Sequence, residues 1–277
     1  MKSYSMNMKT VALSFSLAIA AATGVQAAPP GEYQCLIEPY QRIEIRSPVE
    51  ALIDSILVER GSQVRKGEPL VKLDSGIEQA ALASARYRAI MEGQVKSSEA
   101  RLNYARDKHR RRSELHEQNF ISAQDRDDAY AEMRVAEAEL IEAKDNRELS
   151  ALETRRLEEL LRQRTLTSPF NGVVLELMQH PGELAQTGEG ARAILKLAQI
   201  HPLRVEVVLP VSLYGSIRPG MRAKVRAEVA TGDSYRANVT IVDKVVDSAS
   251  GTFGVRLDLP NPGGRIPAGV KCKVRFE

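Results

Sequence analysis

The four histidines of this 277-residue sequence are the side chains whose spacing tests most directly for metal chemistry. His109 and His116 are seven residues apart, two turns from each other on one face of a predicted helix. Two histidines of one helix can bind the same metal ion when they are four residues apart. At a spacing of seven, His109 and His116 would need further ligands from a second helix. His180 and His201 lie elsewhere, and the methionines beyond residue 27 are dispersed: Met91, Met133, Met178 and Met221. We therefore expect neither a metal site nor a cofactor.

Motifs for nucleophilic or acid–base catalysis are also missing from the sequence. It contains no Gly-x-Ser-x-Gly elbow and no His-Glu-x-x-His pair. Carboxylates are abundant, but no pair of them stands apart from the charge of a helix surface. Aromatic residues make up only 5% of the chain and tryptophan is absent, which argues against a large aromatic-lined substrate pocket. We expect a protein that is not an enzyme.

Residues 1–27 predict a secretory signal peptide. Lys2 and Lys9 supply a positive start, residues 11–22 are apolar or small, and Val25-Gln26-Ala27 offers small residues at a cleavage site. The apolar run is about a dozen residues, against the roughly 20 that a membrane-spanning helix needs, so we expect cleavage in preference to an uncut anchor. Cleavage takes two positive charges from a net charge of +3 and leaves +1, which gives no electrostatic reason to bind nucleic acid.

The exported protein is expected to stay in the periplasm without a lipid anchor or a membrane span of its own. Cys35 follows Glu32-Tyr33-Gln34, which are polar or bulky where a lipoprotein signal has small and aliphatic residues. No later segment approaches 18 consecutive apolar residues.

An internal repeat is the most informative feature of the chain. Residues 46–73 match residues 167–197 at an offset of 121, and three extra residues in the second copy adjust its end. Each copy alternates apolar and polar residues, turns at a glycine and resumes with a short strand. Neither copy could bury its apolar face alone, so the two should pack together as one small β-sandwich. The matched positions are Ser47-Pro48 with Ser168-Pro169, Ala51 with Gly172, Ile53 with Val174, Ile56 with Leu177, Gly61 with Gly182, Gly67 with Gly188, and Lys72-Leu73 with Lys196-Leu197.

Residues 75–164, between the two copies, predict an antiparallel helical hairpin. The segment has no proline, and good helix formers dominate it. Ser75 and Glu78 form a capping-box pattern, and Ser122 and Asp125 approximate a second one after the interruption at residues 118–121. Two arms of about 40 residues would reach roughly 60 Å at 1.5 Å per residue. One arm of an ordinary helical domain is the alternative.

A narrow apolar seam, typical of coiled coils, is predicted along both arms. In the second arm it consists of Ala129, Met133, Ala136, Leu140, Ala143, Leu157 and Leu161. In the first arm the same register selects Ile77, Ala81, Met91, Val95, Leu102 and Ala105, with gaps at Ser84, Arg88 and Ser98.

Residues 203–276 predict a small β-barrel, because several short strands are separated by Gly/Pro turns. The expected strands are 203–209, 223–229, 235–246, 253–259 and 270–276, and residues 211–217 could form a short helix. Turn signals lie at Arg218-Pro219-Gly220, Thr231-Gly232-Asp233 and Asn261-Pro262-Gly263-Gly264.

This order of elements resembles the membrane fusion protein family (HlyD-like), the periplasmic adaptors of tripartite efflux and secretion systems. The resemblance covers residues 33–277 and implies an elongated mixed α and β fold: a split lipoyl-like β-sandwich with an inserted coiled-coil hairpin, followed by a β-barrel. It rests on short phrases in a fixed order around the hairpin: Ser47-Pro48, Gly-Ser-Gln-Val-Arg-Lys-Gly at 61–67, Ser168-Pro169-Phe170-Asn171-Gly172 and Pro267-Ala268-Gly269-Val270. The implied parts are a signal peptide (1–27), an N-terminal strand that joins the barrel (28–44), the two lipoyl-like halves (45–74 and 165–201), the hairpin (75–164) and the barrel (202–277).

The resemblance also implies partners and a docking site. Family members that serve resistance-nodulation-division (RND) transporters share an Arg-x3-Leu-x6-Ser pattern that docks on a TolC-like outer-membrane channel, and here it reads Arg111, Leu115 and Ser122. Alternatively, Arg111 belongs to a solvated run, Leu115 to the seam and Ser122 to a helix cap. The expected function is a homo-oligomeric adaptor between an inner-membrane RND-type transporter and that channel, for efflux of small molecules. An ATP-driven (ABC-type) exporter remains the alternative partner.

Larger family members continue after the barrel into a membrane-proximal domain, whereas the resemblance here ends with the last barrel strand. We therefore expect the barrel face, the lipoyl-like module or another subunit to contact the transporter. A true lipoyl or biotinyl carrier is disfavoured, because it needs a modifiable lysine at a tight hairpin tip. Lys72 and Lys196 fall inside strands, and the helical arm replaces the tip itself.

The implied architecture brings the two cysteines together. The chain must enter the lipoyl-like module from the barrel side and finish in the barrel, so Cys35 and Cys272 should lie on neighbouring strands. Export permits disulfides, and a bridge is expected between them. Two unrelated buried thiols are the alternative.

Overall fold

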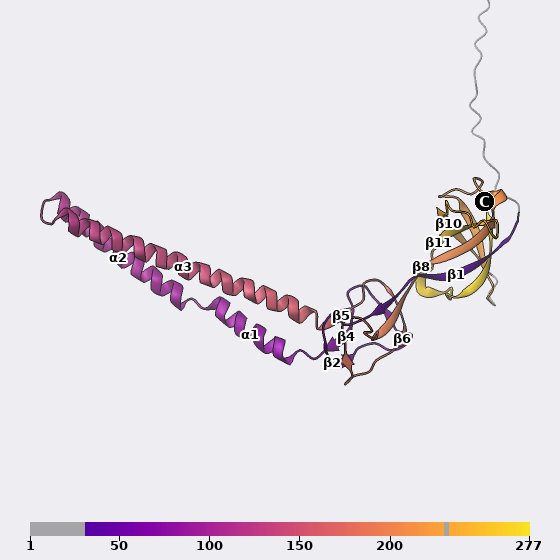
Figure 1. Cartoon of the computed structure of the whole chain (residues 1–277), viewed down its shortest axis with the longest axis horizontal. Helices are drawn as coiled ribbons and strands as arrows, with labels where there is room; N and C mark the ends of the chain where they lie inside the picture. The colour runs from indigo at the N-terminus through magenta and orange to yellow at the C-terminus, as the bar shows by residue number, and fades with distance from the viewer. Residues whose placement is uncertain (1–30, 230–232) are drawn as a thin grey trace, which may run out of the picture. The chain divides into compact units, whose positions relative to one another are not determined.

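The structure is a computed structural model that describes residues 31–229 and 233–277 (Figure 1). The predicted signal peptide and Thr231-Gly232 of one predicted turn lie outside the described residues. The described chain forms two compact units. The barrel unit contains the described residues up to Cys35 together with Glu206–Leu257 and Lys271–Glu277, and the second unit contains Leu36–Val205 with Asp258–Val270.

The two repeat copies of the second unit exchange strands with each other. The first copy forms β2 (Ala51–Ile56), β3 (Gln63–Val64) and β4 (Pro69–Leu73), and the second forms β5 (Thr165–Thr167), β6 (Gly172–Leu177), β7 (Leu184–Ala185) and the start of β8 (Leu195–Pro210). One sheet has the order β5-β4-β2-β7, and β3 pairs with β6, which pairs with β8. Three of these pairs, β2–β7, β4–β5 and β3–β6, join one copy to the other.

One shared core confirms the predicted sandwich. Its buried residues come from both copies: Ile53, Val58, Val64, Leu70, Val71, Leu73, Leu166, Phe170, Val174, Ala185, Ile194, Leu195 and Leu197. The backbone repeats as the sequence does: Gly61 N–H donates to the Val174 carbonyl oxygen and Gly182 N–H donates to that of Ile53, both at 2.8 Å. The φ angles of Gly61 and Gly182 are +89° and +87°, values that a side chain disfavours.

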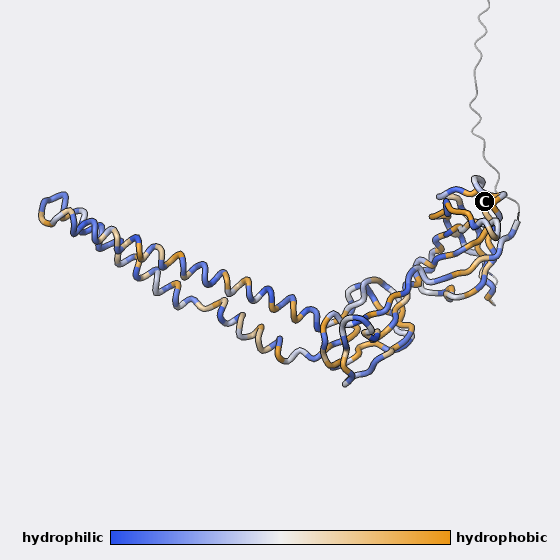
Figure 2. Tube along the Cα trace, in the orientation of Figure 1, coloured by the Kyte–Doolittle hydropathy of each residue, from blue (hydrophilic) through white to orange (hydrophobic). Residues whose placement is uncertain are grey.

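The inserted segment forms the predicted antiparallel hairpin. Helices α1 (Gly76–Ile90) and α2 (Gly93–Glu117) run alongside the continuous α3 (Ala123–Arg162) (Figure 1). The hairpin is mostly hydrophilic, with apolar positions spaced along it (Figure 2). Its seam near the tip buries small and aliphatic side chains: Val95, Ser98, Leu102 and Ala105 from α2, and Ala129, Ala136 and Ala143 from α3. Met133 and Leu140 pack against this seam, as predicted.

The predicted seam is wrong in the lower part of the first arm. Ile77 and Met91 are 84% and 55% exposed, and Leu82 and Ala85 are buried in their place. The cause is a break between α1 and α2, where Met91 is extended with φ −66° and ψ 120°. The buried residues below the break lie one position after those that an uninterrupted register selects.

The predicted capping box at the start of α1 is also wrong. Ser75 makes no side-chain cap; the N–H of Gly76 donates to the Asp74 carboxylate at 3.2 Å. Glu78 cannot reach back to cap the helix because it forms an ion pair with Arg164 at the base of the other arm.

The barrel sheet has the order β1-β12-β9-β10-β11-β8, and a β1–β8 pairing closes it. Its strands are β1 (Tyr33–Ile45), β8, β9 (Arg222–Ala227), β10 (Ser234–Val242), β11 (Thr252–Leu259) and β12 (Val270–Phe276). Buried side chains alternate with more accessible ones, as in β11, where Phe253, Val255, Leu257 and Leu259 are all buried and the residues between them are partly buried. Two expectations change: the predicted strand 235–246 ends at Val242, and the helix at 211–217 is only the 3₁₀ turn Val211–Leu213. A second 3₁₀ turn is Pro262–Gly264.

The two cysteines lie in the barrel unit. The structure joins Cys35 of β1 to Cys272 of β12 by a disulfide, with Cα atoms 4.8 Å apart and a sequence separation of 237. Both are buried, at 8% and 1% exposure. Such a bond would tie the first described strand to the last one.

We predict that the unreduced, denatured protein contains no thiol that can be alkylated. The free energy of unfolding of a Cys35→Ala/Cys272→Ala variant should be lower by about 3–5 kcal/mol, because the unfolded chain regains the entropy of a long loop. Urea unfolding with and without a reductant measures the difference, and the reductant should leave the double variant unchanged. Two alkylatable thiols in the unreduced protein would contradict the bond.

Candidate functional site

The end of α2 is fixed by a Schellman motif. Asn119 takes the left-handed conformation, with φ 63°, that allows the chain to leave the helix. Its N–H donates to the His116 carbonyl oxygen at 2.8 Å, and the N–H of Phe120 donates to that of Leu115 at 2.9 Å. These bonds satisfy carbonyl groups that the helix end would leave free, so the chain reverses within a few residues.

The start of α3 is fixed by the predicted cap at Ser122. Its hydroxyl oxygen accepts the Asp125 N–H at 3.2 Å, and the hydroxyl donates to the Asp125 carboxylate at 2.6 Å. The hydrogen bond from the Ser122 side chain lowers the pKa of Asp125, and the nearby guanidinium of Arg112 lowers it further. Arg112 lies 3.4 Å from Asp125 and so bridges the two arms at the tip.

Both hairpin histidines have structural contacts. His116 Nδ1 lies 3.2 Å from the Ile121 carbonyl oxygen, where an Nδ1–H would donate across the loop. The His109 ring packs against Tyr130, with ring centroids 5.3 Å apart. Within the described ranges, no group of three or more His, Cys, Asp or Glu side chains could hold a metal ion.

The three residues of the docking pattern are all exposed at this tip. Arg111 and Leu115 are one turn apart on α2, and Ser122 lies just across the loop. Leu115 is 40% exposed and is therefore not part of the seam. Ser122 is a cap, as the alternative interpretation had it, and its hydroxyl is also accessible.

Arg111 differs from the arginines on either side of it. Arg110 pairs with Asp107 at 2.9 Å, and Arg112 pairs with Asp125. Among the residues that the structure describes, Arg111 has no ion-pair partner. Its five N–H donors are therefore available to another molecule.

Comparison with known proteins agrees with this geometry. Residues 87–146 match the family model of the RND MFP alpha-helical hairpin domain, and residues 203–277 match that of the CusB-like beta-barrel domain. The chain is 26% identical over 250 residues to the multidrug efflux pump subunit AcrA of Escherichia coli, covering 86% of this chain and 59% of the relative. The chain belongs to the membrane fusion protein family.

One further relative and one solved structure are similar to this membrane fusion protein. The multidrug resistance protein MdtE of Escherichia coli is 26% identical over 265 residues, covering 89% of this chain and 65% of the relative. The crystal structure of MacA from Actinobacillus actinomycetemcomitans shares the fold, with a TM-score of 0.74, 20% identity, and coverage of 89% of this chain and 77% of that one. The chain thus spans under two thirds of the length of the curated relatives AcrA and MdtE. Among the described residues, no helix is both long and apolar enough to cross a bilayer.

Phe120 is a tip residue that sequence reasoning missed in this membrane fusion protein. Its side chain is 73% exposed, and its backbone N–H donates to the carbonyl oxygen of the exposed Leu115 at the same helix end. The only signal in the sequence was one aromatic residue within a short polar interruption. Together with Leu115 it gives the tip an apolar area next to the free guanidinium of Arg111.

The helix cap at Ser122 leads to a prediction about the pKa of Asp125. Because the folded pKa of Asp125 is below its unfolded value, the cap contributes fully above the ordinary pKa of about 3.9 and is lost as the pH falls through the folded value. Ser122→Ala should raise the pKa of Asp125 toward the ordinary value, whereas the nearby Ser113→Ala should leave it unchanged. An NMR titration of the carboxylate measures both variants. An equal pKa of Asp125 in wild type and Ser122→Ala would show that the cap does not hold the carboxylate.

Proposed function

We propose that the protein is a periplasmic adaptor that links an inner-membrane transporter to an outer-membrane channel for the efflux of small molecules. The observation that carries the proposal is the exposed hairpin tip, whose helix ends are fixed by hydrogen bonds and where an unpaired guanidinium, exposed apolar side chains and a helix cap lie between Arg111 and Ser122. The donor fork of Arg111 suits carboxylates or backbone carbonyls at a channel end. The predicted signal peptide would deliver the chain to the periplasm.

The adaptor acts by assembly and performs no bond chemistry. The hairpin buries one narrow seam and leaves large apolar side chains outside it: Tyr87, Tyr104, Val135, Ile141 and Leu149 are each between 57% and 67% exposed. Such side chains at intervals along a charged hairpin suit lateral packing of several copies, whose hairpins would form a tube that meets the channel.

An RND-type transporter is the preferred inner-membrane partner. The matching hairpin model carries the description RND MFP, and AcrA is described as a multidrug efflux pump subunit. The tip pattern of Arg111, Leu115 and Ser122 also resembles adaptors of this class. An ATP-driven exporter is the second candidate, because the overall fold does not distinguish adaptors of the two transporter classes.

Introducing a negative charge at the tip tests the proposed docking. Arg111→Asp, Leu115→Asp and Ser122→Asp should each reduce drug resistance to the level of a strain that lacks the adaptor. Two controls should keep wild-type resistance: Arg110→Asp lies in the same arginine run, and Asn103→Asp replaces an exposed polar residue of the same helix about 18 Å below Leu115.

The measurement is the minimal inhibitory concentration in a strain whose resistance depends on this adaptor. All five variants should retain the fold, since exposed substitutions usually change the free energy of unfolding by less than about 0.5 kcal/mol. Wild-type resistance in all three tip variants would refute the docking role, as would an equal loss in the two controls.

The transporter class is tested by purification of the adaptor from membranes after chemical cross-linking. We expect an RND-type transporter to co-purify, and to do so equally with wild type and with Leu115→Asp, because the tip lies outside the transporter contact. Recovery of an ATP-binding transporter instead would assign the adaptor to an ATP-driven exporter and overturn the RND proposal.

A further inference from the structure

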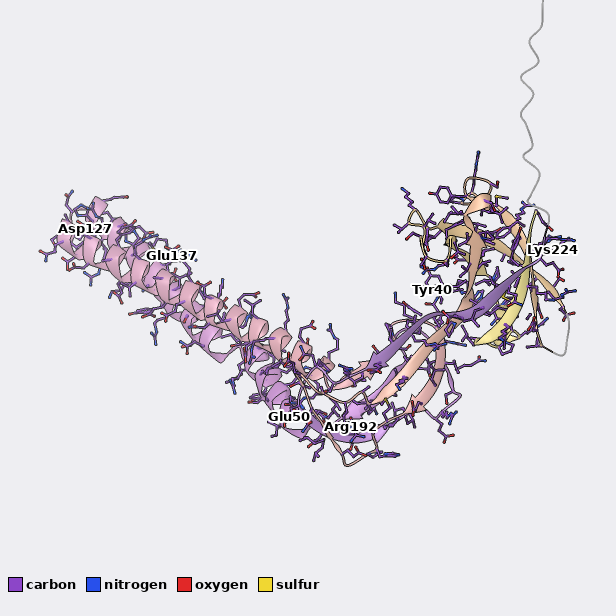
Figure 3. The ribbon with its side chains drawn as sticks, turned by 45° about the vertical axis from the view of Figure 1, so that its right-hand side comes forward. Tyr40, Glu50, Asp127, Glu137, Arg192 and Lys224 are labelled. Carbon is purple, nitrogen blue, oxygen red and sulfur yellow. A yellow bond between two sulfur atoms is a disulfide. The ribbon has the colours of Figure 1, made fainter. Side chains whose placement is uncertain are left out.

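One outward surface of the barrel unit is unusually rich in positive charge. Alternate residues of three neighbouring strands, β12, β9 and β10, point away from the barrel interior, and seven of them are lysine or arginine. We name this surface the basic face, and Lys224 within it is labelled in Figure 3. Its residues are Lys271, Lys273 and Arg275 of β12, Arg222, Lys224 and Arg226 of β9, and Arg236 of β10.

The strand register places these cations side by side. Lys273 is opposite Arg226, Arg275 is opposite Lys224, and Lys224 is in turn opposite Arg236. Side chains directly opposite each other in antiparallel strands lie about 5 Å apart at Cβ, and like charges there destabilise the sheet. The sequence therefore retains an arrangement that costs folding stability.

The surrounding carboxylates neutralise only part of this charge. Lys224 pairs with Glu277 at 3.1 Å and Arg226 pairs with Glu32 at 3.0 Å, and Glu228 is exposed just after β9. The exposed Asp233 directly precedes β10, so seven cations against four carboxylates leave an excess of three positive charges on this surface, as large as the net charge of +3 of the whole chain. The other five cations form no ion pair with any residue that the structure describes: Arg222, Arg236, Lys271, Lys273 and Arg275.

The opposite side of the same barrel does not show this pattern. There Arg204 and Arg256 are matched by Glu206 and Asp258 on β8 and β11, and Arg256 pairs with Glu206 at 3.3 Å, so the charges of these two strands are balanced. The excess of positive charge is therefore local to β12, β9 and β10, and is not a general property of the barrel surface.

We propose that the basic face binds the anionic phospholipid headgroups of a membrane surface. Cores of protein–protein interfaces are poor in lysine and contain aromatic or aliphatic anchors, but no large apolar side chain is exposed on β9 or β12, and β10 offers only Ile241 near its end. A headgroup layer requires no anchor and no shaped pocket, because it presents negative charge over a wide surface. A ladder of cations on a sheet fits that target better than it fits a folded protein partner.

The proposal is independent of the proposed adaptor function, because it depends only on the barrel unit. Attraction of this kind is peripheral and reversible, and salt screens it. It would hold the barrel at a membrane surface without any membrane-spanning segment in the described residues.

Vesicle binding by the purified protein tests the proposal. Co-sedimentation should show binding to phosphatidylcholine vesicles that contain about 30% phosphatidylglycerol, little binding to pure phosphatidylcholine, and loss of binding as the salt rises from about 0.05 M to about 0.5 M. Reversal of three unpaired cations, Arg236→Glu, Lys273→Glu and Arg275→Glu together, should weaken the binding to anionic vesicles by about tenfold or more.

A matched variant carries the same change of charge away from the basic face. Arg60→Glu, Lys144→Glu and Arg155→Glu replace exposed cations of the second unit that form no ion pair among the described residues, and binding should stay within about twofold of wild type. The N-terminal apolar segment is common to all three proteins and cannot explain a difference among them.

The melting temperature of the basic-face variant is the control for folding. The basic-face variant should melt at or above the temperature of wild type, because each new carboxylate stands beside a cation of β9. The proposal is overturned if wild type binds neutral and anionic vesicles equally. It is also overturned if the basic-face variant melts normally and still binds as wild type does, or if the matched control loses as much binding.

Discussion

The exchange of strands between the two repeat copies is the constraint on which the rest of the second unit depends. Neither copy has a complete core, so Leu70 and Val71 are buried only because Leu166 and the strands of the second copy cover them.

The pairing of β4 with β5 also positions the inserted hairpin. It fixes the two ends of the inserted hairpin side by side, since Lys72 is opposite Thr165 at the point where the helical segment leaves and returns. The ion pair of Glu78 with Arg164 then joins the arms at their base. The hairpin is thus positioned by the sandwich, and the tip is positioned by the length and packing of the hairpin.

The packing of the hairpin explains why its two arms lie close together and why the first arm is broken between α1 and α2. Ala129, Ala136 and Ala143 line α3 at intervals of seven, and such small side chains let the arms come close along a narrow seam. The first arm cannot keep one register along its whole length, because helix α1 must start beside Arg164 while α2 must present Val95 to the seam. The break at Met91 absorbs this difference of one position. Helices α1 and α2 can therefore each pack against the continuous helix α3.

Sequence patterns correctly predicted the elements whose conformation depends on residues close together in the chain. The alternation and the glycines at 61 and 182 predicted the sandwich, because strand period and positive φ are properties of a few adjacent residues. In the first arm the seam was predicted correctly above the break and wrongly below it, since the break at Met91 shifts the buried positions of α1 by one residue. The cap at Ser75 failed for a different reason: Glu78 had a distant partner that no local pattern contains. At the tip, the docking pattern located Arg111, Leu115 and Ser122, but the exposure of Phe120 follows from the turn at Asn119 and could not be read from composition.

The geometry of the tip assigns different tasks to its residues. The Ser122 hydroxyl donates its only hydrogen to Asp125 and accepts the N–H of the same residue, so it has at most one lone pair for a partner. In the proposed docking, we therefore expect Arg111 to donate hydrogen bonds to the partner, since its guanidinium forms no ion pair within the described chain. Leu115 and Phe120 add apolar area that water must leave on contact, which favours association without specifying direction. Ser122 contributes chiefly by its small size and by holding the start of α3. In the proposed docking, such an arrangement would separate the binding energy, which is mainly apolar, from the orientation, which would depend mainly on Arg111.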